Sequence, residues 1–113
     1  MRSGRLTVLL VLAAMLAALA SPAGAAPPPT KTVTIKNYAF HPGKLKIHKG
    51  TKVIWQFKDA PVLHNVTVTK GPFKFHSRNM RSGTYSHLFS RKGTWVLHCT
   101  LHPATMIETI VVS

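Results

Sequence analysis

Residues 49–57 read KGTKVIWQF, and this stretch sets the fold class of the chain. Val53, Trp55 and Phe57 are large apolar residues at every second position. Side chains two positions apart lie on the same face of a β-strand, so this pattern predicts a strand with one buried face. The Lys-Gly pair at residues 49–50 marks a turn immediately before it.

The same period of two recurs along most of the chain. Six further runs show it, at residues 33–35, 45–47, 66–68, 85–89, 95–99 and 110–112. Turn signals rich in Gly and Pro separate the runs, and no segment after residue 25 sustains a helical apolar period. Seven short strands in fewer than a hundred residues predict an all-β protein, an antiparallel Greek-key β-sandwich. Residues 73–81 are the least periodic part and are expected to form a long connection with room for a short helical turn.

The N-terminus has the pattern of a secretory signal peptide. Arg2 and Arg5 precede an apolar run at residues 6–20, and the small residues Ala-Gly-Ala at 23–25 supply a cleavage site. The run is shorter than the roughly 20 residues that span a bilayer, although an uncleaved membrane anchor is the alternative. We therefore expect residues 1–25 to be a signal peptide, followed by a Pro-rich extended lead-in at residues 26–31 and one domain at residues 32–113. The protein is expected to be exported, to a periplasm or to the extracellular space.

Composition excludes several classes of function. The chain has 15 Lys and Arg against 2 Asp and Glu, and it has one Cys. A single Cys excludes a disulfide scaffold. The two carboxylates, Asp59 and Glu108, offer no supported hydrolase nucleophile, so an enzyme is not expected. The basic residues are scattered over alternating strand positions with no nucleic-acid motif, which argues against nucleic-acid binding despite the charge.

The residues HCTLHPATM near the C-terminus carry the chemistry. Cys99 supplies a thiolate, His102 an imidazole three residues later, and Met106 a thioether four residues further on. Sulfur ligands together with imidazole suit copper, and two His, one Cys and a distant Met form the blue-copper arrangement. His64 supplies the second imidazole if the strand at residues 66–68 lies beside the strand that ends at Cys99.

These stretches resemble the cupredoxin family of type 1 blue copper proteins, in particular the plastocyanin, pseudoazurin and amicyanin group. The matching stretches are FHP at 40–42, KGTKVIW at 49–55, HNVTV at 64–68 and GTWVLHCTLHP at 93–103. The resemblance covers nearly the whole chain after residue 32. It implies a two-sheet sandwich in which His64, Cys99, His102 and Met106 bind one copper ion, and it implies transfer of single electrons.

Each proposed ligand has a simpler alternative. Cys99 could be a buried structural thiol, and His64 and His102 could be ordinary loop histidines. Met106 could fill the core, with a backbone carbonyl or nothing in the axial position. Asn65 follows His64 and is expected to brace the backbone around the ligands from the second shell.

The other five histidines are expected at the surface. They are His41, His48, His76, His87 and His98. His98 alternates with Cys99 along its strand and is therefore expected to point away from the metal.

The predicted function is single-electron transfer by a mononuclear Cu(I)/Cu(II) site in a small, exported, basic carrier. An extracytoplasmic copper carrier or buffer with the same ligands is the alternative. Leu101, Pro103 and Ala104 would surround His102 with a small apolar patch suited to brief docking. The positive charge predicts an acidic redox partner, and an anionic membrane or cell surface as a further association. A monomer is expected.

Overall fold

The computed structural model describes residue 24 and residues 26–113, so the predicted signal peptide lies outside the described residues except for Gly24. Eight strands form: β1 (Thr30–Lys36), β2 (Ala39–His41), β3 (Lys44–Ile47), β4 (Thr51–Phe57), β5 (Thr67–Lys70), β6 (Gly83–Phe89), β7 (Gly93–His98) and β8 (Ile107–Val112). Among the described residues, no helix is long and apolar enough to cross a membrane.

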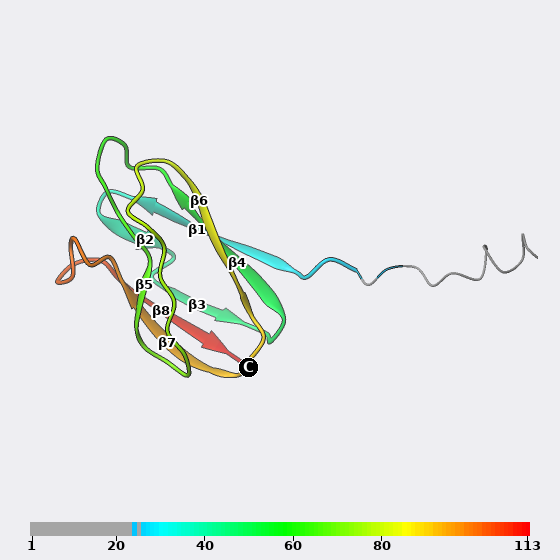
Figure 1. Ribbon diagram of the computed structural model, residues 1–113. Helices are drawn as coiled ribbons and strands as arrows, with labels where there is room; N and C mark the ends of the chain where they lie inside the picture. Colours follow the sequence, from blue (N-terminus) through cyan, green and yellow to red (C-terminus); the bar gives the residue numbers. More distant parts are fainter. Residues whose placement is uncertain (1–23, 25) are drawn as a thin grey trace, which may run out of the picture.

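The strands build two four-stranded sheets packed face to face (Figure 1). One sheet has the order β2-β1-β4-β6 and the other the order β3-β8-β7-β5. The predicted sandwich is confirmed, and each predicted run lies in or overlaps a strand. The additional strand is β2, which has only three residues and pairs with the end of β1.

The expectation that all strands run antiparallel is wrong for two pairs. β1 pairs with β4 in parallel, and so does β3 with β8. Parallel neighbours need a connection that crosses over before it returns. Such a crossover exists here because β3, which lies between β1 and β4 in the sequence, belongs to the opposite sheet.

The core consists of the inward faces of both sheets. In β4 the burial alternates strictly, with Val53, Trp55 and Phe57 inside, as the sequence pattern predicts. In β7 the same holds for Trp95 and Leu97, and the alternation continues to Cys99 beyond the strand. Burial of large apolar side chains on both layers supplies the main stabilisation of a domain this small.

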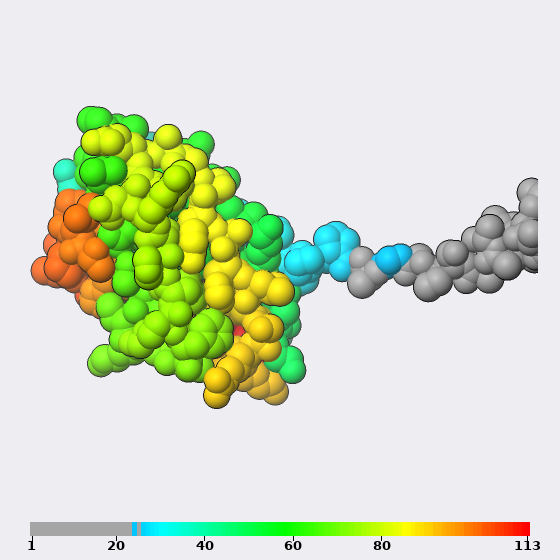
Figure 2. Space-filling view, in the orientation of Figure 1, coloured from blue at the N-terminus to red at the C-terminus, as the bar shows by residue number. Residues whose placement is uncertain are grey.

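The long connection between β5 and β6 holds no helix, so the short helical turn does not form. Two isolated bridges attach it: Met80 pairs with His64, which precedes β5, and His76 pairs with Thr67, the first residue of β5. His64 donates its backbone N–H to the Met80 carbonyl at 3.0 Å, and Met80 returns the bond to His64 at 2.8 Å. The backbone at His64 is thereby fixed between two segments. In the space-filling view the connection, in green, covers the middle of the visible face (Figure 2).

Candidate metal centre

The register of β5 against β7 brings the two halves of the predicted site together. Thr67 pairs with His98 in an antiparallel ladder, so the residues before β5 lie beside the residues after β7. The Sγ of Cys99 is 3.8 Å from the Nδ1 of His64. The expectation that the strand at 66–68 lies beside the strand ending at Cys99 is therefore confirmed.

Three potential metal ligands converge at this end of the sandwich. His64, Cys99 and His102 each offer a donor atom, and these atoms all lie within 4.8 Å of one another. His64 and Cys99 are buried, with 1% and 0% of their surface exposed, and His102 is half-buried. Metal–sulfur and metal–nitrogen bonds of about 2.3 and 2.0 Å in a trigonal plane place the two ligand atoms about 3.7 Å apart. The separation between Cys99 and His64 fits a shared metal ion.

The loop from Cys99 to Met106 closes on itself through backbone hydrogen bonds. His102 donates its N–H to the Cys99 carbonyl at 3.1 Å, and Met106 donates to the His102 carbonyl at 3.0 Å. Cys99 in turn donates to the Met106 carbonyl at 3.2 Å. This loop holds the backbone of Met106 beside Cys99, and the Met106 side chain is fully buried. In Figure 1 the loop, in orange, projects from one end of the sandwich, away from the N-terminal lead-in.

Asn65 connects the two segments that carry the ligands. Its Nδ2 donates to Asn79 Oδ1 at 2.9 Å and to Thr100 Oγ1 at 2.7 Å, and its Oδ1 accepts from the Thr100 N–H at 3.0 Å. Its own backbone N–H donates to Cys99 Sγ at 3.4 Å. A hydrogen bond to the sulfur favours the thiolate and tunes a metal bound to it. These hydrogen bonds join the segment that carries His64 to the segment that carries Cys99.

Asp59 and Tyr38 also contact the cluster, and the sequence analysis missed both. Asp59 Oδ2 lies 2.8 Å from His64 Nε2 and accepts the Tyr38 backbone N–H at 3.1 Å. The hydrogen bond with His64, together with the bonds from the Tyr38 and Asn37 backbone, holds the pKa of the Asp59 carboxyl below its ordinary value of 3.8. The two ring nitrogens of His64 therefore face different groups: Nδ1 faces the Cys99 sulfur, and Nε2 faces the Asp59 carboxylate.

The Tyr38 ring packs edge-on against both histidines of the cluster. Its centroid lies 4.8 Å from that of His102 and 5.6 Å from that of His64. Tyr38 follows Asn37 in the turn between β1 and β2, and both have positive φ, 56° and 53°. Asn adopts this conformation readily, whereas for Tyr it is rare, so the turn holds the ring at a local conformational cost.

The apolar residues predicted to surround His102 lie at the surface. Leu101 is 44% exposed, and Pro103 and Ala104 are also exposed. Tyr38, 48% exposed, joins them through its contact with His102. An apolar surface with an aromatic residue therefore surrounds the half-buried His102. The Nε2 of His102 is itself buried, and within the described part of the chain it has no hydrogen-bond partner. A buried ring nitrogen is costly unless a hydrogen bond or a metal satisfies it.

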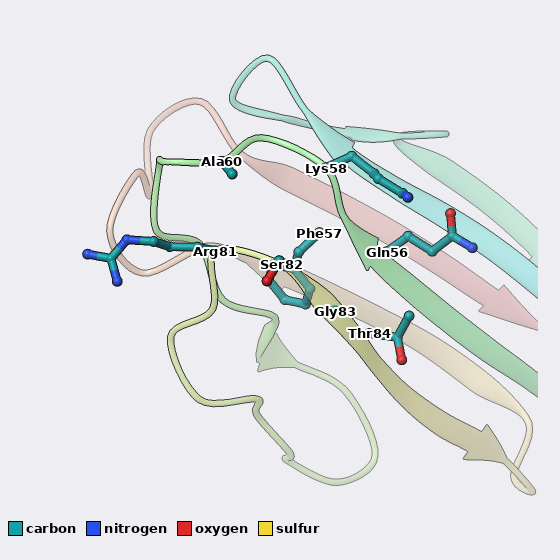
Figure 3. Close-up of a pocket in the computed structure, with 8 residues that line it drawn as sticks. All are labelled: Gln56, Phe57, Lys58, Ala60, Arg81, Ser82, Gly83 and Thr84. Carbon is teal, nitrogen blue, oxygen red and sulfur yellow. The ribbon is translucent and has the colours of Figure 1, made fainter.

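A separate pocket of about 460 Å³ lies where β4 ends and β6 begins (Figure 3). Its lining residues are Gln56, Phe57, Lys58, Ala60, Arg81, Ser82, Gly83 and Thr84. None of the predicted copper ligands lines it. The Arg81 guanidinium extends away from the pocket in Figure 3, and its Nε donates to the Pro61 carbonyl at 3.2 Å.

The remaining histidines lie outside the cluster. His41, His48 and His76 are exposed as expected. His98 faces away from Cys99 along the alternating strand and contacts the Pro103 carbonyl at 3.0 Å, which fixes the ligand loop from outside. For His87 the surface prediction is wrong: its ring stacks on Phe75 at 3.8 Å, its Nε2 is buried, and this burial lowers its pKa.

A two-sheet sandwich with a buried His-Cys-His cluster at one end defines a copper protein of the cupredoxin type. The family model of copper binding proteins, plastocyanin/azurin family, matches residues 30–113, and the chain belongs to this family. A reduced amicyanin variant is 28% identical, with 74% of this chain and 82% of that chain covered and a TM-score of 0.66. A purple cupredoxin from Nitrosopumilus maritimus is 26% identical, with coverage of 73% and 98% and a TM-score of 0.64. Comparison with curated proteins found no match.

Family membership settles the general character of the protein. Its cofactor is copper, and the cluster is typical of one type 1 copper ion. Cupredoxins of this kind are electron carriers without enzymatic activity, and they pass electrons to redox partners. Members of the family are typically extracytoplasmic.

Proposed function

We propose that His64, Cys99, His102 and Met106 bind one copper ion as a type 1 site, and that the protein transfers single electrons through it. The observation that carries the proposal is the convergence of donors from two distant segments, with Cys99 Sγ 3.8 Å from His64 Nδ1. Thiolate, imidazole and thioether donors together select copper. Bound copper supplies the one-electron Cu(I)/Cu(II) couple.

The surrounding residues hold the donors in place during electron transfer. The backbone bridge to Met80 fixes His64, and the hydrogen-bonded loop fixes Cys99, His102 and Met106 relative to one another. A site that moves little between oxidation states lets an electron arrive or leave with little rearrangement. Four protein donors leave no open position for a substrate, unlike catalytic metal sites, which keep one.

The domain boundaries and the export route belong to the same proposal. Residues 1–25 would be a signal peptide, residues 26–31 an extended lead-in and residues 32–113 the copper domain, working in a periplasm or outside the cell. The last two residues of the lead-in, Thr30 and Lys31, already pair with β4 as the start of β1. The lead-in joins the sandwich at the end opposite the metal loop (Figure 1). Whether residues 1–25 are cleaved or kept as an anchor, this arrangement leaves the metal end accessible to partners.

The electron would leave through His102 to a partner docked on the surface formed by Tyr38, Leu101, Pro103 and Ala104. A small apolar contact suits a brief encounter. With Arg2 and Arg5 lost in the signal peptide, 13 basic and 2 acidic residues remain. This charge steers a monomeric carrier toward an acidic redox protein, and toward anionic membrane or cell surfaces, in a salt-dependent way. The rate of reduction by an acidic partner should fall as salt is added, and a salt-independent rate would refute the steering.

Copper carriage or buffering is the second candidate, since it uses the same donors. Electron relay is favoured because His64, Cys99 and Met106 are buried and because Asn65 ties their segments together, which slows metal release. Fast self-exchange between the oxidised and reduced forms supports relay. Rapid loss of copper to an acceptor chelator, faster than self-exchange, supports carriage.

The ligand set is tested by adding Cu(II) to the purified protein and recording its visible spectrum. An intense thiolate-to-copper band is expected, with one copper per chain, and Cys99→Ser should abolish it. His48→Ala is the matched control, because this exposed histidine follows β3 and lies outside the cluster, and the band should persist in this variant. A colourless wild-type protein, or a band that survives Cys99→Ser, would refute the proposal.

A further inference from the structure

We propose that Asp59 is a positioning residue of the copper site: it holds His64 in the tautomer that turns Nδ1 to the metal and stabilises Cu(II) relative to Cu(I). The inference rests on the proposed function and assigns a role to one of the two acidic residues of the chain. Neither the family match nor the motif of the proposed ligands assigns a role to Asp59.

The geometry of His64 gives the first argument. Its Nε2 lies 2.8 Å from Asp59 Oδ2, while its Nδ1 faces Cys99 Sγ at 3.8 Å. A carboxylate accepts hydrogen bonds, so Nε2 carries the proton and Nδ1 keeps its lone pair free for the metal. Carboxylate–histidine–metal triads orient the ring and raise the basicity of the ligand in this way.

The carboxylate is itself held in place, which gives the second argument. The same Oδ2 accepts the backbone N–H of Tyr38 at 3.1 Å, from the turn between β1 and β2. The Asp59 carbonyl accepts the Val62 N–H at 3.0 Å, which closes the loop that leads to His64. The Asp59 side chain is only 15% exposed. A fixed carboxylate of this kind restricts the rotation of His64 before any metal arrives.

Charge gives the third argument. Asp59 places a negative charge against a ligand of the metal, and its interaction is partly sheltered from water because the side chain is mostly buried. An added negative charge favours the more positive ion, Cu(II), over Cu(I). Loss of such an outer partner typically weakens metal binding about 10–100-fold. We expect the loss to fall more heavily on Cu(II), by about tenfold.

The decisive variant is Asp59→Asn, which keeps the shape of the side chain and removes its charge. A tenfold larger loss for Cu(II) than for Cu(I) raises the reduction potential by about 59 mV, the one-electron equivalent of a tenfold ratio. The matched control is Lys58→Gln, which changes the charge of the exposed neighbouring residue. If net charge alone mattered, this control would shift the potential by a similar amount in the opposite direction, whereas we expect a much smaller shift.

Two outcomes would overturn the inference. The first is an unchanged reduction potential in Asp59→Asn, which means equal losses of Cu(II) and Cu(I) affinity and indicates a merely structural role. The second is read from nitrogen NMR of the copper-free wild-type protein, which also decides if Asp59→Asn does not fold: Asp59 should hold the proton of the neutral His64 ring on Nε2, and a proton on Nδ1 would overturn the inference. Absence of the thiolate-to-copper band in the wild-type protein would instead refute the proposed function.

Discussion

The buried carboxyl of Glu108 predicts how the stability of the fold depends on pH. Its side chain is completely buried on β8, among apolar residues of the sandwich interior. Oε1 accepts a hydrogen bond from Trp55 Nε1 at 2.7 Å, and Oε2 is buried with no hydrogen-bond partner among the residues that the structure describes. Burial raises the pKa of this carboxyl from an ordinary 4.5 to about 8, and the bond from Trp55 offsets only part of the effect. Glu108 is therefore protonated and neutral in the native protein at neutral pH.

The raised pKa makes the free energy of unfolding depend on pH in one direction. Between pH 4.5 and about 8 the native state keeps a proton that the unfolded chain has released. The contribution of Glu108 is therefore fully present below pH 4.5 and is lost progressively as pH rises toward 8. At about 1.4 kcal/mol per pH unit, the whole loss is on the order of 5 kcal/mol. That is a large share of the roughly 5–15 kcal/mol that stabilises a typical domain.

The assay compares the wild-type protein with Glu108→Gln, both free of copper, by urea unfolding from pH 5 to pH 8. Gln keeps the shape and can still accept the bond from Trp55, but it does not ionise. The two proteins should have similar stability at pH 5, and the variant should be more stable by several kcal/mol at pH 8. The two proteins differ only at residue 108, so the difference between their pH profiles isolates Glu108. Parallel pH profiles would refute the buried neutral carboxyl.

Three further substitutions test particular contacts. Asn65→Ala removes four side-chain hydrogen bonds, two of which, with Thr100, join the ligand segments. Urea unfolding should therefore show a loss of about 2–3 kcal/mol, and copper should dissociate faster; normal stability would contradict the brace. Tyr38→Ala removes the ring that packs against His102 but no proposed metal ligand. Stopped-flow reduction by a partner protein should therefore slow, while the visible band stays unchanged. Loss of the band would instead make Tyr38 part of the metal site. Gly71→Ala places a methyl group 2.6 Å from the Trp95 ring, at a residue with a φ of 156°. Thermal unfolding should show a loss of stability of about 1–3 kcal/mol. Full stability would show that the turn can move.

Local patterns explain why much of this fold could be predicted from the sequence. The alternation in β4 and β7 identifies strands and their buried faces, because each strand of a two-sheet sandwich buries one apolar face in the core. The spacing of Cys99, His102 and Met106 is set by one short loop, so it is visible in the sequence. His64 could be identified as a ligand only with a fold that brings it beside Cys99, and the resemblance to cupredoxins supplied that fold.

The parts that could not be predicted depend on contacts between distant residues. Glu108 shares its strand face with Ile110 and Val112, so its burial follows from alternation, but its partner Trp55 is 53 residues away. Tyr38 contacts His64 and His102 from a turn in which it has positive φ, and Tyr has no local preference for that conformation. Asp59 has no motif of its own, and its contact with His64 depends on the path of one loop.

X-ray absorption of the copper-loaded protein would decide between a type 1 copper site and any other, because it reports the atoms bound to copper. We expect one sulfur at a short distance and two imidazole nitrogens in both oxidation states, with little change in bond lengths between them. The short sulfur contribution should disappear in Cys99→Ser. A copper ion surrounded only by nitrogen and oxygen in the wild-type protein, or bond lengths that change strongly on reduction, would contradict it.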